Sequence, residues 1–269
     1  QTVLIFSESS ALPRHGRCFF VHSAYVLTIC QLYGMICKSL LSKREYHQIR
    51  TPCDLHGEKE RFESMNFAII GCGEAGIFAG YELMHRNPGL KVVTLDQGAD
   101  IYTRSCPIVA GKVKECIHCK VCDTMCGFGG AGAFSDGKYN FTTAFGGWLT
   151  DFMPKREVME LIDYVDSINM RHGATDQVFS TETPAAQALE KRALEFDLHL
   201  LQARCKHLGT ENNLKILQSI YEEVRQGVEF RFRTAVTKIE NLGQEGYRLI
   251  TDKGDEVDCT WLIAGPGRS

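Results

Sequence analysis

The sequence predicts an α/β fold with a central parallel sheet between two outer layers, and three observations support this prediction. An apolar run at 67–70 ends in a glycine-rich turn, which is typical of a buried parallel strand. Residues 77–86 then follow helical spacing, and a second apolar strand follows at 90–95. Strand, helix and strand in this order form a β-α-β unit, from which parallel sheets are built.

The remaining elements follow in chain order. Residues 103–150 are rich in Cys and Gly and have little periodicity, so we expect them to form an inserted loop region across the face of the sheet. An apolar stripe predicts an amphipathic helix over 156–171, with Gly173 as its C-terminal stop. Short alternating strands after residue 228 predict a small β-meander. The full set of further expected elements is helices over 185–194 and 210–225 and strands over 198–203, 228–232, 235–240, 247–251, 256–259 and 261–264.

Composition sets limits on the partners of this protein. The chain has 269 residues, of which 44% are hydrophobic and 23% charged, as in ordinary globular proteins. Its formal net charge of -3 gives no basic footprint for nucleic acid. We therefore expect no nucleic-acid partner.

The first 64 residues differ from the rest of the chain. Residues 18–37 contain no Asp, Glu, Lys or Arg and are long enough to span a membrane, but several polar residues interrupt them. A signal peptide also fits badly. We interpret residues 1–64 as a non-homologous or disordered extension before a domain that starts at Met65. A membrane anchor is the alternative, which we do not favour, and we expect a cytoplasmic protein. Because the chain stops directly after a glycine turn at 265–267, we expect it to be a fragment.

The turn after the first strand carries the main functional motif. It reads Gly71-Cys72-Gly73-Glu74-Ala75-Gly76 and opens the following helix. In a dinucleotide-binding turn of a Rossmann-like fold, Gly71 permits the tight turn, Gly73 lets the backbone approach the pyrophosphate and Gly76 allows close helix packing. The helix N-terminus supplies N–H donors to the phosphates, and Asp96 would accept hydrogen bonds from the ribose hydroxyls. The motif predicts NAD or FAD as ligand; an ordinary strand-turn-helix is the alternative.

Three further landmarks resemble flavoproteins of the glutathione-reductase structural type. The first is Asp96-Gln97-Gly98, at the end of the second strand. The second is the strand around Val236, whose backbone lies against the adenine in that group. The third is Ala264-Gly265-Pro266-Gly267, the turn after a hydrophobic strand. This resemblance implies that the dinucleotide is FAD and that Gln97, Gly98, Val236, Ala264, Gly265 and Gly267 belong to its binding site.

More specifically, residues 65–269 resemble a group of FAD-dependent dehydrogenases that are often described as NAD(FAD)-utilising. The resemblance depends on the segments 126–138, 146–149 and 264–269. The sequence departs from the group in two places, with Glu74 where Pro is common and Asp96 where Glu is common. Glu74 puts a carboxylate close to the phosphates. Members of the group continue past residue 269 with a segment that contacts the flavin ribityl and ring.

Five of the twelve cysteines fall within 21 positions. The spacing Cys116-x2-Cys119-x2-Cys122-x3-Cys126 matches a bacterial ferredoxin run, in which successive thiolates converge on one 4Fe-4S cluster, and Cys106 is a further candidate ligand. A structural zinc site and redox-active thiols that exchange electrons with the flavin are the alternatives.

The glycine-rich segment 127–137 has five glycines in eleven residues, which indicates a backbone that approaches a flat or charged group. We expect Gly129, Gly130, Ala131 and Gly132 to lie against the flavin or its pyrophosphate. Ser135, Asp136 and Lys138 would be polar groups near the ring. A mobile surface loop is the alternative.

These observations predict an FAD-dependent oxidoreductase or dehydrogenase that uses NAD(P)H and acts with a small-molecule redox substrate or an electron-transfer partner. A cysteine-bound iron-sulfur or zinc centre is a candidate second cofactor. No catalytic acid or base follows from the sequence. Two other classes remain open: a non-catalytic metal-binding module with an empty flavin site, and a membrane-anchored electron carrier.

Overall fold

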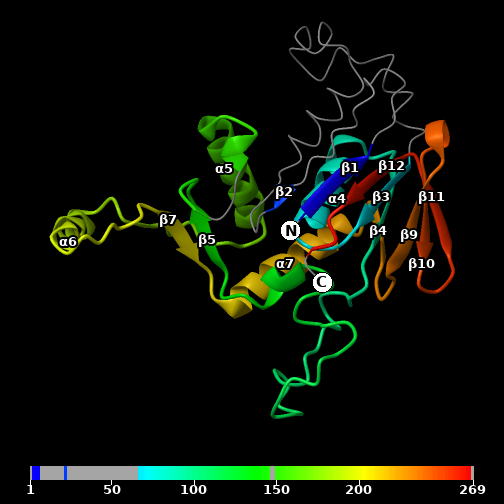
Figure 1. Ribbon diagram of the computed structural model, residues 1–269, viewed down its shortest axis with the longest axis horizontal. Coiled ribbons are helices and arrows are strands. Elements are labelled where there is room, and N and C mark those ends of the chain that lie inside the picture. The colour runs from blue at the N-terminus through cyan, green and yellow to red at the C-terminus, as the bar shows by residue number, and fades with distance from the viewer. Residues whose placement is uncertain (1, 7–20, 23–65, 146–148, 268–269) are drawn as a thin grey trace, which may run out of the picture.

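The computed structural model describes residues 2–6, 21–22, 66–145 and 149–267 of the chain (Figure 1). Its centre is a sheet in which four strands run parallel, because β12 pairs with β3, β3 with β4, and β4 with β8 in the same direction. The predicted α/β fold with a central parallel sheet is therefore confirmed. The order across the sheet is β2 (Val21–His22), β1 (Thr2–Phe6), β12 (Trp261–Ala264), β3 (Asn66–Ile70), β4 (Lys91–Leu95) and β8 (Val228–Arg231).

Both faces of this sheet are covered, which explains why its strands are apolar runs rather than alternating patterns. On one face, Phe67 and Ile69 pack with helices α4 (Glu74–Arg86) and α7 (Thr210–Val224). On the other face, Ala68 packs against a small antiparallel sheet. That sheet is the predicted β-meander, with the order β11 (Glu256–Cys259), β10 (Tyr247–Thr251) and β9 (Val236–Asn241).

The helices begin and end close to the predicted positions. Helix α5 spans Lys155–Arg171, and Gly173 follows it with a positive φ of 99°. Helix α6 spans Pro184–Leu194, and the Thr183 hydroxyl caps it by accepting a hydrogen bond from the Ala186 N–H. None of its residues is buried, and it lies away from the main sheet, at the far left of Figure 1.

A second three-stranded sheet corrects two expectations. Strand β5 (Lys138–Phe141) lies within the region expected to be loop, and it pairs with β7 (Arg204–His207), which also pairs with β6 (Phe179–Ser180). The strand predicted at 198–203 was wrong, because this stretch has no regular structure and its leucines are exposed. Short strands form where they find a pairing partner, and β5 lies more than sixty positions from β7 in the sequence.

Only two pieces of the N-terminal region are described. Strand β1 pairs antiparallel with β12, and β2 pairs antiparallel with β1, so both extend the sheet at its edge. Apart from these two strands, residues 1–64, which we expected to form an extension, lie outside the described ranges. The candidate membrane segment 18–37 also lies outside them, except for β2. Among the described residues, no helix has the length and apolar character needed to cross a bilayer.

Leu249 tests the packing of the β-meander on the main sheet. This side chain is fully buried between the two sheets. Leu249→Ala should lower the free energy of unfolding by about 2–5 kcal/mol, because the removed methyl groups leave a cavity. Leu189→Ala, on the exposed helix α6, is the matched control and should change it by less than about 0.5 kcal/mol. Chemical denaturation monitored by circular dichroism measures both; equal effects would contradict this packing.

Candidate functional site

A cavity of about 670 Å³ lies at the carboxyl ends of the parallel strands. The segments that follow β3, β4 and β12 all reach it, at Gly71, Asp96 and Gly265 respectively. Part of the glycine-rich segment and residues 234–236 complete the wall. Open α/β sheets bind ligands at this position, and the volume suits a ligand of cofactor size.

The glycine turn takes the shape that the sequence predicts. Gly71 has φ +95°, and a Cβ there would lie 2.3 Å from the Gly265 carbonyl oxygen. A Cβ on Gly76 would lie 1.9 Å from the Gly71 carbonyl oxygen. Both positions therefore require glycine. Gly73 lines the cavity and precedes α4, and no side chain caps this helix N-terminus.

Asp96 is more than a surface carboxylate, because it is 91% buried and holds three segments together. One oxygen accepts a hydrogen bond from the Cys72 N–H at 2.6 Å. The other accepts from the Gly98 N–H at 2.7 Å and the Gly127 N–H at 2.9 Å. A carboxylate has about four acceptor positions. Asp96 lines the cavity, and about one of its acceptor positions remains for the predicted hydrogen bond from a ribose hydroxyl.

The glycine-rich segment is fixed to the dinucleotide turn. The Gly129 N–H donates to the Cys72 carbonyl at 2.8 Å, and the short helix η2 (Gly130–Phe134) follows. The Asn213 side chain donates to the Gly132 carbonyl at 2.8 Å. These bonds do not fit the alternative of a loose surface loop.

The structure brings most of the predicted cofactor residues together on the cavity wall. Those that line it are Gly71, Gly73, Glu74, Asp96, Gln97, Gly130, Ala131, Gly132, Val236, Gly265 and Gly267, and the polar residues Ser135, Asp136 and Lys138 join them. Those that do not line it are Cys72, Ala75, Gly76, Gly98, Gly129 and Ala264. The second group supports the wall from behind; for example, a Cβ on Gly98 would lie 2.3 Å from the Gly127 nitrogen.

Sequence reasoning missed several lining residues. Thr234, Ala235 and Pro266 were next to residues already singled out, so the motifs could have included them. Tyr139 and Asn140 gave no signal, because β5 was expected to be loop.

The predicted metal centre is not supported. Within the residues that the structure describes, no three His, Cys, Asp or Glu side chains are grouped to hold a metal ion. Cys116 and Cys119 are exposed, whereas Cys126 is buried, lines the cavity and accepts a hydrogen bond from the Gln97 amide at 3.4 Å. The regular spacing fixes the number of residues between the cysteines but not the backbone conformation of these segments. Here the thiols lie in different surroundings. Cys106 and Cys122, both partly buried, are free thiols as well.

Glu74 is the unusual residue of the site. It is the first residue of α4, and a Cβ on Gly132 would lie 2.9 Å from its Oε1. Burial raises the pKa of its carboxyl from an ordinary value of 4.5 to about 7, because the charged form loses hydration. Burial, with Glu74 and Asp166 nearby, also raises the pKa of the Tyr139 phenol, whose OH donates to the Asn213 amide oxygen at 3.0 Å.

Comparison with known proteins adds limited information. No family model matches the chain, and no curated protein sequence matches it. Among solved structures, glycine oxidase from Geobacillus kaustophilus is similar at 15% identity and a TM-score of 0.42, over 76% of this chain and 56% of that one. CtdE in complex with FAD is similar at 16% identity and a TM-score of 0.39, over 76% and 38%. Cyclohexanone monooxygenase from Rhodococcus sp. Phi1, bound to NADP+, is similar at 19% identity and a TM-score of 0.36, over 76% and 26%. The similarity thus covers between about a quarter and just over half of these chains.

Asp96→Asn tests the carboxylate that joins the three segments. An amide oxygen can replace only one carboxylate oxygen, and its NH2 group would face a backbone N–H, so at least one buried donor loses its partner. The free energy of unfolding should fall by about 2–4 kcal/mol. Asp176→Asn, at an exposed position, should change it by less than about 0.5 kcal/mol. Equal stability of the two variants in urea would contradict the role assigned to Asp96.

Glu74→Gln tests the raised pKa. A carboxyl whose pKa rises from 4.5 to about 7 on folding stabilises the folded state when it is protonated. This stabilisation is complete below pH 4.5 and is lost as the pH rises to 7. The loss amounts to at most about 3 kcal/mol. Because Gln carries no charge, the variant should gain stability over the wild type at pH 8 but not at pH 4.5. Thermal unfolding at both pH values measures this, and a difference that does not depend on pH would contradict the shift.

Proposed function

We propose that the chain binds FAD in the large cavity and belongs to an FAD-dependent oxidoreductase. One observation carries the proposal: an uncapped helix N-terminus and a turn that sterically requires glycine open onto a cavity of about 670 Å³ at the carboxyl ends of parallel strands. Backbone N–H donors and the positive end of a helix dipole suit a diphosphate. The resemblance to NAD(FAD)-utilising dehydrogenases and to the glutathione-reductase type favours FAD over NAD.

The residues present fit the parts of FAD. The turn 71–76 would hold the pyrophosphate, and the remaining acceptor position of Asp96 would take one ribose hydroxyl. The backbone at 234–236 would lie against the adenine, as the resemblance implies. Gly130 to Gly132 would approach the flavin end, where Lys138 would place a positive charge.

Flavin, when bound, supplies the hydride-accepting chemistry. The chain's own contribution is to orient the cofactor, to hold its phosphates and to set the charge around them. Glu74 works against the phosphates when it is ionised, since like charges repel. A proton on Glu74 removes this repulsion, so we expect FAD to bind more tightly below pH 7 than at pH 8.

Titration with FAD, followed by quenching of flavin fluorescence, tests the proposal. FMN lacks the AMP half of FAD, and with it the pyrophosphate, and should bind at least tenfold more weakly, a difference of about 1.4 kcal/mol. Ala131→Glu places a further carboxylate on the cavity wall at an exposed position and should weaken FAD binding at least tenfold. Ala144→Glu makes the same change at an exposed position outside the cavity and should leave it unchanged. Equal affinity for FAD and FMN, or equal loss in both variants, would contradict the site.

A further inference from the structure

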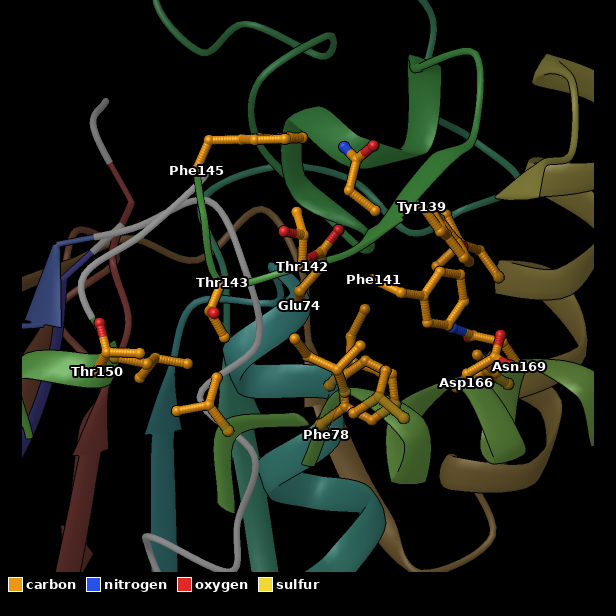
Figure 2. Close-up of a pocket in the computed structure, with 18 residues that line it drawn as sticks. Glu74, Phe78, Tyr139, Phe141, Thr142, Thr143, Phe145, Thr150, Asp166 and Asn169 are labelled. Carbon is orange, nitrogen blue, oxygen red and sulfur yellow. The ribbon is translucent and has the colours of Figure 1, made fainter. Parts of the chain in front are cut away.

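A second cavity, of about 100 Å³, lies between helices α4, α5 and α7 and strand β5 (Figure 2). It shares three lining residues with the large cavity: Glu74, Tyr139 and Asn140. The two spaces are therefore neighbours, with the Glu74 side chain between them.

Most of the wall of this small cavity is apolar. Phe78 from α4, Phe141 from β5, Val165 from α5 and Leu217 from α7 all line it, and each of them is buried. Exposed residues such as Thr150 also line it, so it is a pocket that is reached from the surface and not an enclosed void. An apolar wall with a few polar groups is the usual form of a small-molecule site.

Two side chains of α5 on this wall carry polar atoms without a hydrogen-bond partner among the described residues: Asp166, through its Oδ1 atom, and Asn169. Only 6% of Asn169 is exposed, yet its side-chain amide makes no hydrogen bond to any of the described residues. The fully buried side-chain atoms that lack a partner do not include this amide, so the amide keeps contact with the space of the cavity. Its position on the wall leaves the amide free to bond a molecule in the cavity (Figure 2).

Charge restricts the class of ligand. Asp166 lies one helical turn from Asn169 on the same face of α5, and its Oδ2 is paired with the Lys206 Nζ at 2.6 Å. Lys206 is 2% exposed, so the pair is neutral overall, and the other oxygen of Asp166, Oδ1, is buried without a partner and can accept a hydrogen bond from a hydroxyl group. Glu74, when ionised, disfavours an anion at the other end. The wall thus suits a neutral molecule.

We propose that the small cavity binds a neutral, largely apolar molecule of about four or five carbons that carries one hydroxyl or carbonyl group, with the Asn169 amide as its hydrogen-bond partner. A 150 Å³ apolar cavity holds benzene, so 100 Å³ suits a somewhat smaller molecule. The further step, that this cavity receives the substrate beside the flavin, rests on the proposed function.

Saturation-transfer NMR on the purified chain without flavin tests the site, with butan-2-ol as probe and 2-methylbutane as the hydrocarbon of equal size. The alcohol should bind at least threefold more tightly than the hydrocarbon. Ile162→Trp fills the cavity and should abolish binding of both. Thr150→Trp blocks the same cavity from an exposed position, and so keeps the test decisive where the first variant fails to fold.

Asn169→Leu separates a ligand-binding amide from a structural one. Because this amide makes no hydrogen bond to the described residues, its removal should not lower the thermal midpoint of the ligand-free protein, and it should reverse the preference, so that 2-methylbutane binds better than butan-2-ol. A lower midpoint with an unchanged preference would overturn the proposal, as would a wild type that binds neither probe and holds only water. Because this experiment contains no flavin, a negative result does not contradict the proposed FAD site. In the same way, a negative FAD titration does not contradict binding in the small cavity.

Discussion

The carboxylate of Asp96 is the interaction on which the large cavity depends. It accepts hydrogen bonds from the backbone after β3, after β4 and at the start of the glycine-rich segment. Cys72 lies 24 positions before Asp96 and Gly127 lies 31 positions after it, and in a buried place each N–H needs a partner. A single buried side chain thus satisfies three of them and sets the distance between the turn and the segment opposite it.

Close backbone contacts fix the rest of this wall. The turn after β12 approaches the turn after β3 so closely that only glycine fits at Gly71, and Gly98 packs against the backbone at Gly127 in the same way. Such contacts exclude side chains from this wall, and the first N–H groups of α4, which have no partner within the helix, begin beside it. An anionic ligand is the partner that this surface suits.

Glu74 is a residue that the two cavities share. Its carboxyl lies at the start of α4, beside Gly132, and lines both cavities. Because burial brings its pKa to about 7, its charge changes near neutral pH. Binding of the proposed ligands in either cavity would therefore be coupled to the protonation of this group, since each ligand would change the environment in which the carboxyl ionises.

The sequence by itself determined the β-α-β unit, the positions of the main helices and the glycine turn. These features follow from local rules, because the apolar period and the steric demand of Gly76 on the Gly71 carbonyl act within a few residues. Only the tertiary structure decided the partners of Asp96, the separation of Cys116 and Cys119 from the buried Cys126, and the pairing of β5 with β7. Each depends on residues that are distant in sequence, and neither spacing nor composition specifies how the chain brings such residues together.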